Sequence, residues 1–209
     1  MAVLPPSRRR PISSARMLDA LDLFPAQGEW DETAFLELSG RTNRLIELSD
    51  GYLEVLPMPG KSHQRIAVFL FNLLREHVEG SGLGEVLIAP YPIRLWPGKV
   101  REPDIVVALG TKADQLGEEI GDAPDLVVEV LSKDRQRDLV VKRREYAKAG
   151  IREYWLIDPR NRQFTVLSLT GRTYSVYGEF HVGDEAKSKL LGGWSASTAS
   201  IFEAGASPE

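Results

Sequence analysis

The chain has 209 residues, which suits one domain with additional segments, and its 43% apolar and 27% charged residues are typical of a globular protein. It contains no cysteine, which excludes disulfides and thiolate metal sites and fits the reducing cytoplasm. The formal net charge of −4 opposes nonspecific binding of nucleic acid, and no apolar run reaches the roughly 18 residues of a membrane span. We therefore expect a cytoplasmic protein that does not enter a membrane.

The two ends of the chain differ in composition from its middle. Residues 1–16 contain three prolines and an arginine triplet with no apolar segment after it, so we expect a disordered N-terminal segment and no secretory signal. We expect a single domain over residues 17–203 and a flexible tail over residues 204–209.

The first half of the chain predicts a hairpin followed by a helix. Two apolar runs, residues 45–48 and 52–56, flank Asp50-Gly51, and an Asp-Gly pair between such runs indicates a β-hairpin. After a Pro-rich break, apolar residues recur at helical spacing over residues 62–79, and Ser62 is the expected N-cap.

The second half predicts an α/β fold. Three strands are expected at residues 84–95, 104–109 and 125–131, then a helix at 137–149, a strand at 153–158 and a hairpin of strands 163–169 and 172–177. From the first helix onward the order is α-β-β-β-α-β, which indicates a sheet with helices on its faces.

A carboxylate interrupts one of the buried strands. Glu129 stands in the otherwise apolar run 126–131, and Asp104 stands at the start of the preceding strand. An unpaired buried carboxylate either becomes neutral or binds a cation. Because neighbouring strands lie roughly 4.8 Å apart, both carboxylates could bind one hard cation such as Mg²⁺. The alternative is structural: Glu129 pairs with Lys142, and Asp104 caps a turn.

The helix that follows carries the third candidate. Asp138, Lys142 and Tyr146 lie four residues apart and share one helical face. Lys142 either pairs with Asp138 and only stabilises the helix, or points at Glu129 and stabilises charge on a phosphate. The sequence leaves both interpretations open.

Several further residues are candidates for weaker roles. Residues 133–152 carry eight basic and three acidic side chains, which indicates either a solvated helix face or a surface that steers nucleic acid. Glu54 is a candidate third metal ligand, and His63 at the helix start is a candidate phosphate contact or acid–base group. The candidate nucleic-acid contacts are His63, Lys133, Arg135, Arg137 and Arg143.

The combined motifs resemble the Uma-type putative restriction endonucleases of the PD-(D/E)XK nuclease superfamily. The similarity runs over about residues 33–202 and rests on Glu102-Pro103-Asp104, on 125–132, on the Asp138, Lys142 and Tyr146 spacing and on 150–159. It implies a restriction-endonuclease-like core with an N-terminal hairpin and extra C-terminal strands, and metal binding by Asp104 and Glu129. Leu131 stands where the motif has lysine, so the resemblance implies that Lys142, on the following helix, replaces it.

These observations predict a Mg²⁺- or Mn²⁺-dependent endonuclease that hydrolyses phosphodiester bonds, with DNA as the expected substrate, through a metal-activated water. A homodimer would suit the cutting of both strands. Two alternatives remain: a nuclease-fold module that binds nucleic acid without turnover, and a partner-binding protein in which Glu129 and Lys142 form a buried pair. The sequence has no Gly-rich phosphate loop, His-Glu-x-x-His or Gly-x-Ser-x-Gly motif, which argues against NTPases, zincins and α/β-hydrolases.

Overall fold

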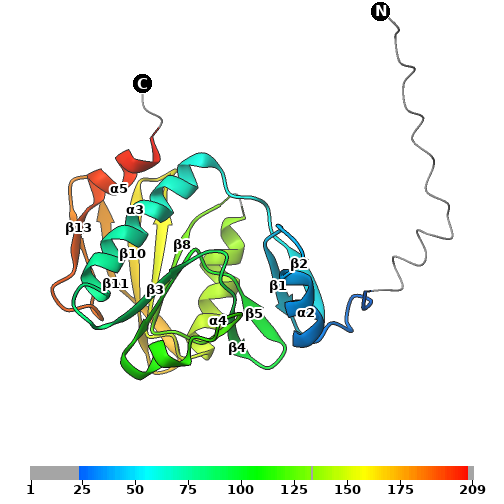
Figure 1. Cartoon of the computed structure of the whole chain (residues 1–209). Coiled ribbons are helices and arrows are strands. Elements are labelled where there is room, and N and C mark those ends of the chain that lie inside the picture. Colours follow the sequence, from blue (N-terminus) through cyan, green and yellow to red (C-terminus); the bar gives the residue numbers. More distant parts are fainter. Residues whose placement is uncertain (1–23, 133, 207–209) are drawn as a thin grey trace, which may run out of the picture.

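The computed structural model describes residues 24–132 and 134–206, and its centre is a six-stranded mixed sheet (Figure 1). The strand order is β11-β10-β9-β8-β6-β3. Helices cover both faces of this sheet, which confirms the predicted α/β class and the α-β-β-β-α-β core. The bounds of its strands are β3 (Gly84–Ile88), β6 (Ile105–Leu109), β8 (Leu126–Val130), β9 (Glu153–Asp158), β10 (Gln163–Thr170) and β11 (Thr173–His181).

The register of the central strands places the two candidate carboxylates side by side. Strand β8 pairs antiparallel with β6, with Ile105 opposite Val128, and parallel with β9. Asp104, the residue before β6, lies beside the end of β8, because its side chain accepts the backbone N–H of Val130. Both carboxylates therefore lie at one end of the sheet, as the sequence predicted.

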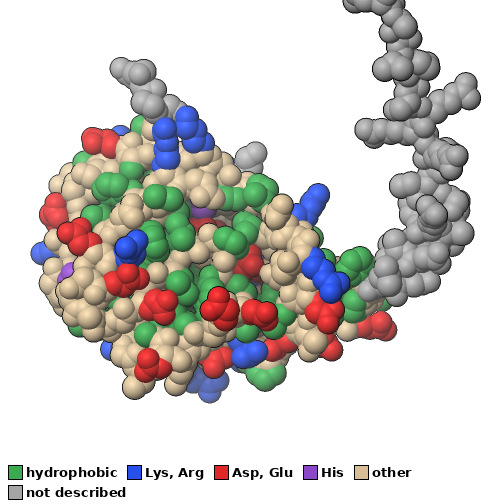
Figure 2. All heavy atoms as spheres, viewed as in Figure 1, with side chains coloured by type: hydrophobic (Ala, Val, Ile, Leu, Met, Phe, Trp, Pro, Cys, Tyr) green, Lys and Arg blue, Asp and Glu red, His purple; other side chains and the backbone are tan. Residues whose placement is uncertain are grey.

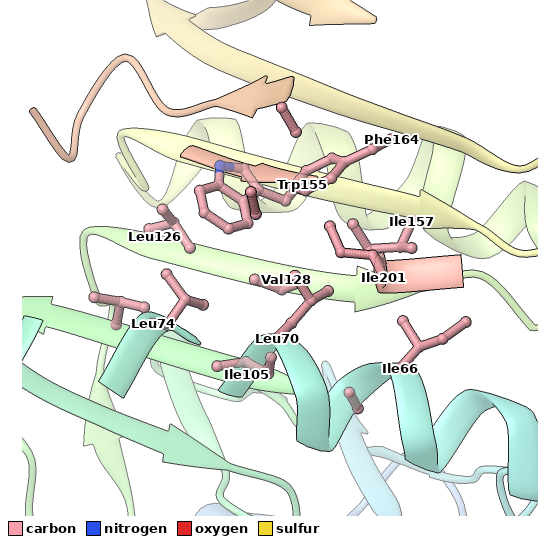
Figure 3. Packing of buried hydrophobic residues seen from close by; sticks show 14 of the residues in the cluster. Ile66, Leu70, Leu74, Ile105, Leu126, Val128, Trp155, Ile157, Phe164 and Ile201 are labelled. Carbon is pink, nitrogen blue, oxygen red and sulfur yellow. The ribbon is translucent and has the colours of Figure 1, made fainter. Parts of the chain in front are cut away.

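Helix α3 (Lys61–Val78) covers one face of the sheet because its apolar residues share one side. Ile66, Leu70 and Leu74 point from the helix toward Ile105 and Val128 of the sheet (Figure 3). Helix α5 (Thr198–Gly205) packs beside α3 and adds Ile201 to the same core. The prediction that Ser62 caps α3 was wrong: the N-cap is Gly60, one residue before the helix, and it makes no side-chain bond.

A second, smaller sheet lies beside the central one and has the order β2-β1-β5-β4-β7 (Figure 1). The predicted hairpin is confirmed, and its turn residues Asp50 and Gly51 both have positive φ. A Cβ on Gly51 would lie 2.5 Å from the carbonyl oxygen of Gly28, so the turn also needs a glycine for close approach. The elements are α2 (Glu32–Ser39), β1 (Ile46–Ser49), β2 (Tyr52–Val55), β4 (Ile93–Trp96), β5 (Lys99–Arg101) and β7 (Gly121–Asp122).

The single strand predicted over residues 84–95 is wrong, because β3 and β4 belong to different sheets. Pro90 and Pro92 lie between them and have no N–H to donate to a ladder, so the chain leaves the central sheet there. Strand β4 then forms a hairpin with β5 in the smaller sheet. This turn brings β5, and with it Arg101, next to the candidate site.

The helix predicted over residues 137–149 exists but has two parts. It begins as a π-helical segment, η2 (Arg137–Lys142), and continues as α4 (Arg143–Lys148), packed on the face of the sheet opposite α3. Its end at Gly150, with φ of 80°, is as predicted. π-helical turns are rare and occur frequently at functional sites.

The remaining elements are short: η1 (Gly110–Gln115), β12 (Glu185–Lys187) and β13 (Ser195–Ser197). Helix α5 includes Ala204 and Gly205, which we expected to belong to the C-terminal tail. The predicted disordered segment 1–16 lies outside the described residues. None of the described helices is both long and apolar enough to cross a bilayer.

Candidate active site

Asp104, immediately before β6, is fixed by two contacts to the same oxygen. Its Oδ2 accepts the backbone N–H of Val130 at 2.7 Å, and it lies 3.1 Å from Nε2 of His63. The first contact ties Asp104 to the strand that carries Glu129, and the second ties it to the first turn of α3. His63 therefore holds Asp104 in place, whereas the sequence had suggested a contact of His63 with phosphate or an acid–base role.

Glu129 is held in the same manner from the opposite face of the sheet. Its Oε1 accepts bonds from Nζ of Lys142 and from the hydroxyl of Tyr146, both at 2.7 Å. The structure thus brings Lys142 to Glu129, which was one of the two interpretations left open. Asp138 also helps to hold Lys142 in this position, because its Oδ1 lies 3.6 Å from the same ammonium group.

Three carboxyl groups, those of Glu129, Glu47 and Asp138, lie within 4 Å of the Lys142 ammonium. Burial raises the pKa of Glu129 to about 8, since the attraction of Lys142 only partly offsets it and Asp138 and Asp104 add repulsion. Burial alone would lower the pKa of Lys142, but Glu129, Glu47 and Asp138 surround the ammonium and raise its pKa above the usual range. Lys142 is therefore charged, whereas burial favours the neutral form of the Glu129 carboxyl group.

Glu47 of β1 belongs to this site, and the sequence analysis missed it. It is fully buried, and its Oε1 lies 3.6 Å from Nζ of Lys142. Burial would raise the pKa of Glu47, but Lys142, Arg101 and Arg137 together lower it to about 2. The signal that identified Glu129, a carboxylate inside an apolar run, is equally present at Glu47 within residues 45–48.

The other hairpin candidate, Glu54, lies apart from the two central carboxylates. Its Oε2 contacts Nη2 of Arg137 and lies 3.4 Å from Nη1 of Arg101. No contact joins Glu54 to Asp104 or Glu129 among the described residues. The structure therefore places Glu54 with Glu47 in a network around Arg101 and Arg137.

Most candidate nucleic-acid contacts bind other groups of the protein. Arg135 donates to Asp158 at 2.6 Å, Arg137 contacts Glu47 and Glu54, and Arg143 donates to the carbonyl of Tyr174 at 3.1 Å. Lys133 lies outside the described residues. The positive excess of residues 133–152 is thus largely used within the fold, and Figure 2 shows charges of both signs interspersed on the face that it presents.

The residues present fit a divalent cation. Among the described residues no group of three or more His, Asp or Glu is arranged to hold a metal ion. Mg²⁺, however, keeps several waters and is often held by one or two carboxylates. Asp104 and Glu129 lie at the same end of neighbouring strands, and Oδ1 of Asp104 and Oε2 of Glu129 accept no bond from a described donor. A cation there would also stabilise the ionised form of Glu129, which burial disfavours.

The sequence matches a known protein family. The family model of Uma2, described as a putative restriction endonuclease, matches residues 32–199. The chain belongs to the Uma2 family. All the residues that form the site in this Uma2 chain lie inside the matched range, which confirms the family predicted from the motifs.

Comparison with solved structures supports the fold of the Uma2 chain. It is similar to a putative nuclease belonging to DUF820 from Anabaena variabilis ATCC 29413, with a TM-score of 0.66 and 19% identity over 82% of this chain and 98% of that one. At this identity the likeness concerns the fold alone. No curated protein matches the sequence.

Proposed function

We propose that this Uma2 protein is a divalent-metal-dependent endonuclease that hydrolyses phosphodiester bonds of nucleic acid, with DNA as the first substrate to test. The observation that carries the proposal is the convergence of Asp104, Glu129 and Lys142 from two strands and a helix at one end of the sheet. Family membership and the nuclease-like fold point in the same direction.

Asp104 and Glu129 would hold Mg²⁺ or Mn²⁺ through their carboxylate oxygens. The bound ion supplies a water of lowered pKa and polarises a phosphate oxygen. His63 and the N–H of Val130 keep Asp104 oriented, so the carboxylate does not have to be ordered when the ion arrives. Because water is the nucleophile, no covalent intermediate with the protein forms.

Lys142 would stabilise negative charge that develops on the phosphate. Its ammonium is already charged and desolvated, and a charge in a site of low dielectric acts more strongly than in water. Three carboxylates, those of Glu129, Glu47 and Asp138, surround it. Glu47 and Asp138 would therefore act as positioning residues: they would keep Lys142 at the site even when Glu129 is a metal ligand.

A second candidate function is a nucleic-acid-binding module without turnover. Oε1 of Glu129 accepts bonds from Lys142 and Tyr146. Buried Glu153 of β9, outside the candidate site, likewise accepts bonds from Ser188, from Trp155 and from two backbone N–H groups, so a buried, hydrogen-bonded glutamate does not require a bound metal. A homodimer and a cytoplasmic location also remain predictions of the sequence.

The test is cleavage of supercoiled plasmid and of labelled single-stranded DNA with Mg²⁺ or Mn²⁺, using wild type, Asp104→Ala and Lys142→Ala. The matched control is Asp114→Asn, an exposed carboxylate of η1. We expect metal-dependent cutting that both site variants lose and the control keeps. DNA binding that ignores the metal, with no cutting by wild type, would favour the binding module instead.

A further inference from the structure

A groove between the η2/α4 helix and β11 collects three arginines. It has a volume of about 340 Å³ and is lined by Leu139, Val140, Arg143, Arg144, Ala147, Arg172, Thr173 and Tyr174. No acidic residue lines it. Arg143 comes from the first turn of α4, Arg144 follows it, and Arg172 comes from the β10–β11 turn.

Arg143, Arg144 and Arg172 differ from the nearby arginines that pair with carboxylates. Arg135, Arg137 and Arg152 each pair with a carboxylate. Over residues 24–132 and 134–206, no ion pair joins Arg143, Arg144 or Arg172 to a carboxylate, although the chain carries a net charge of −4. Three like charges around one hollow repel each other, and a bound anion would remove that repulsion.

One of the three arginines is held in place. Arg143 is half-buried and donates through Nη2 to the carbonyl of Tyr174, whose own hydroxyl donates to the carbonyl of Ile151 at 2.7 Å. This chain of bonds anchors the guanidinium to the protein while its other donors remain for a ligand. Arg144 and Arg172 are exposed and flank it.

We propose that this arginine groove binds the phosphate backbone of the nucleic acid to one side of the reacting phosphate. The inference rests on the proposed function. The groove lies near the candidate site because Arg143 directly follows Lys142 on the helix. A helix with its side chains is about 10–12 Å across, and one DNA strand advances roughly 3.4 Å along the axis per phosphate. The groove is thus within reach of phosphates about three or four nucleotides away.

The chemistry of the groove favours phosphate. Guanidinium groups offer planar pairs of N–H donors that match phosphate oxygens. The apolar wall of Leu139, Val140 and Ala147 lowers the competition from water for these donors. An acidic peptide would offer carboxylates to the same groups, and this alternative is an outcome of the test.

The experiment measures the affinity of the full chain for a labelled DNA duplex over a series of salt concentrations. The groove variants are Arg143→Gln/Arg144→Gln/Arg172→Gln and, in case loss of Arg143 disturbs the fold, Arg144→Glu/Arg172→Glu. The matched control is Arg41→Gln/Arg44→Gln/Arg75→Gln, which removes three exposed arginines elsewhere. We expect the triple groove variant to bind at least tenfold more weakly and its slope of log affinity against log salt to be smaller by about 2–3.

The outcomes separate this inference from the proposed function. Groove variants that bind DNA as tightly as the control overturn the inference, even if wild type cuts DNA and the function stands. Wild type that binds DNA through the groove but cuts nothing upholds the inference while the function fails. Wild type that binds polyglutamate and no DNA overturns it in favour of an acidic partner.

Discussion

The ammonium of Lys142 lies 2.7 Å from Oε1 of Glu129, and neither side chain is more than 6% exposed. The Lys142 ammonium and the Glu129 carboxyl group are thus held in contact away from water, with Glu47 and Asp138 each 3.6 Å from the same nitrogen. Removal of the lysine would leave Glu129 and Asp138 without their cationic partner, whereas Glu47 would keep Arg101 and Arg137.

We expect Lys142→Met to lower the free energy of unfolding by about 3–5 kcal/mol, the cost of breaking a buried pair. The measurement is urea denaturation in EDTA. The double variant Lys142→Met/Glu129→Gln should be more stable than Lys142→Met alone, because one uncompensated charge is gone. Equal stabilities of the single and double variants would contradict the charge argument.

Divalent metal should stabilise the wild type. An ion that binds only the folded state adds about 2.7 kcal/mol at a concentration of 100 times its Kd, so Tm should rise with Mg²⁺ or Mn²⁺. Asp104→Asn and Glu129→Gln should abolish the rise, whereas the exposed control Asp114→Asn should keep it. A rise that persists in both site variants would place the metal elsewhere.

The pKa of Glu47 makes stability depend on acid pH. Its folded pKa of about 2 is below the ordinary 4.5, so the folded state binds this proton less well than the unfolded chain. The stabilisation, about 3 kcal/mol, is complete above pH 4.5 and is lost as pH falls toward 2. Unfolding by urea at pH 7, 4.5 and 3 should show Glu47→Gln losing less stability on acidification than wild type. Parallel curves for the two proteins would refute the assignment.

Glu47→Gln should also lower kcat, by about 10–100-fold, with little change in KM, if Glu47 positions Lys142 for the transition state. The matched control is Glu153→Gln, which removes the charge of another fully buried strand carboxylate that has no contact with Lys142. Steady-state cleavage, corrected for the folded fraction, separates the effects. A similar fall of kcat in both variants would mean that Glu47 acts only through stability.

His63→Ala should weaken metal binding by about 10–100-fold, because partners that orient a metal ligand contribute that much. Titration of Mn²⁺ measured by calorimetry reports this without any turnover. Since His77 lies on the same helix α3 and contacts no candidate ligand, His77→Ala is the control. Unchanged affinity in His63→Ala would show that the contact with Asp104 is not needed.

Much of the fold could be predicted from local patterns. The apolar spacing of α3, the short apolar runs of β6 and β8 and the Asp50-Gly51 turn each act within a few residues, and these elements were found nearly at their true bounds. The errors lie where local signals compete. The apolar run after Gly84 continues past two prolines, and only the pairing of β4 with β5 shows that the chain has changed sheets.

The candidate site divides in the same way. A carboxylate in a buried strand is costly wherever the chain folds, so Asp104, Glu129 and the helix carrying Lys142 were visible in the sequence by itself. The same rule also applies to Glu47 and to Glu153, and it does not tell a catalytic carboxylate from a structural one. Their partners differ: Glu153 binds Ser188, Trp155 and backbone N–H groups, whereas Glu47 meets Lys142, Arg101 and Arg137 and so lies at the candidate site.

The amino-acid sequence therefore determined the order of the elements, the family and the pair of strand carboxylates, because these depend on periodicity and on the identities of neighbouring residues. Only the tertiary structure decided which charges meet. Arg137 and Glu47 are 90 residues apart and Lys142 and Glu129 are 13 apart, yet all four belong to one connected network of charged groups. Coulomb energy depends on distance through space and on burial, and neither is set until the strands and helices have packed.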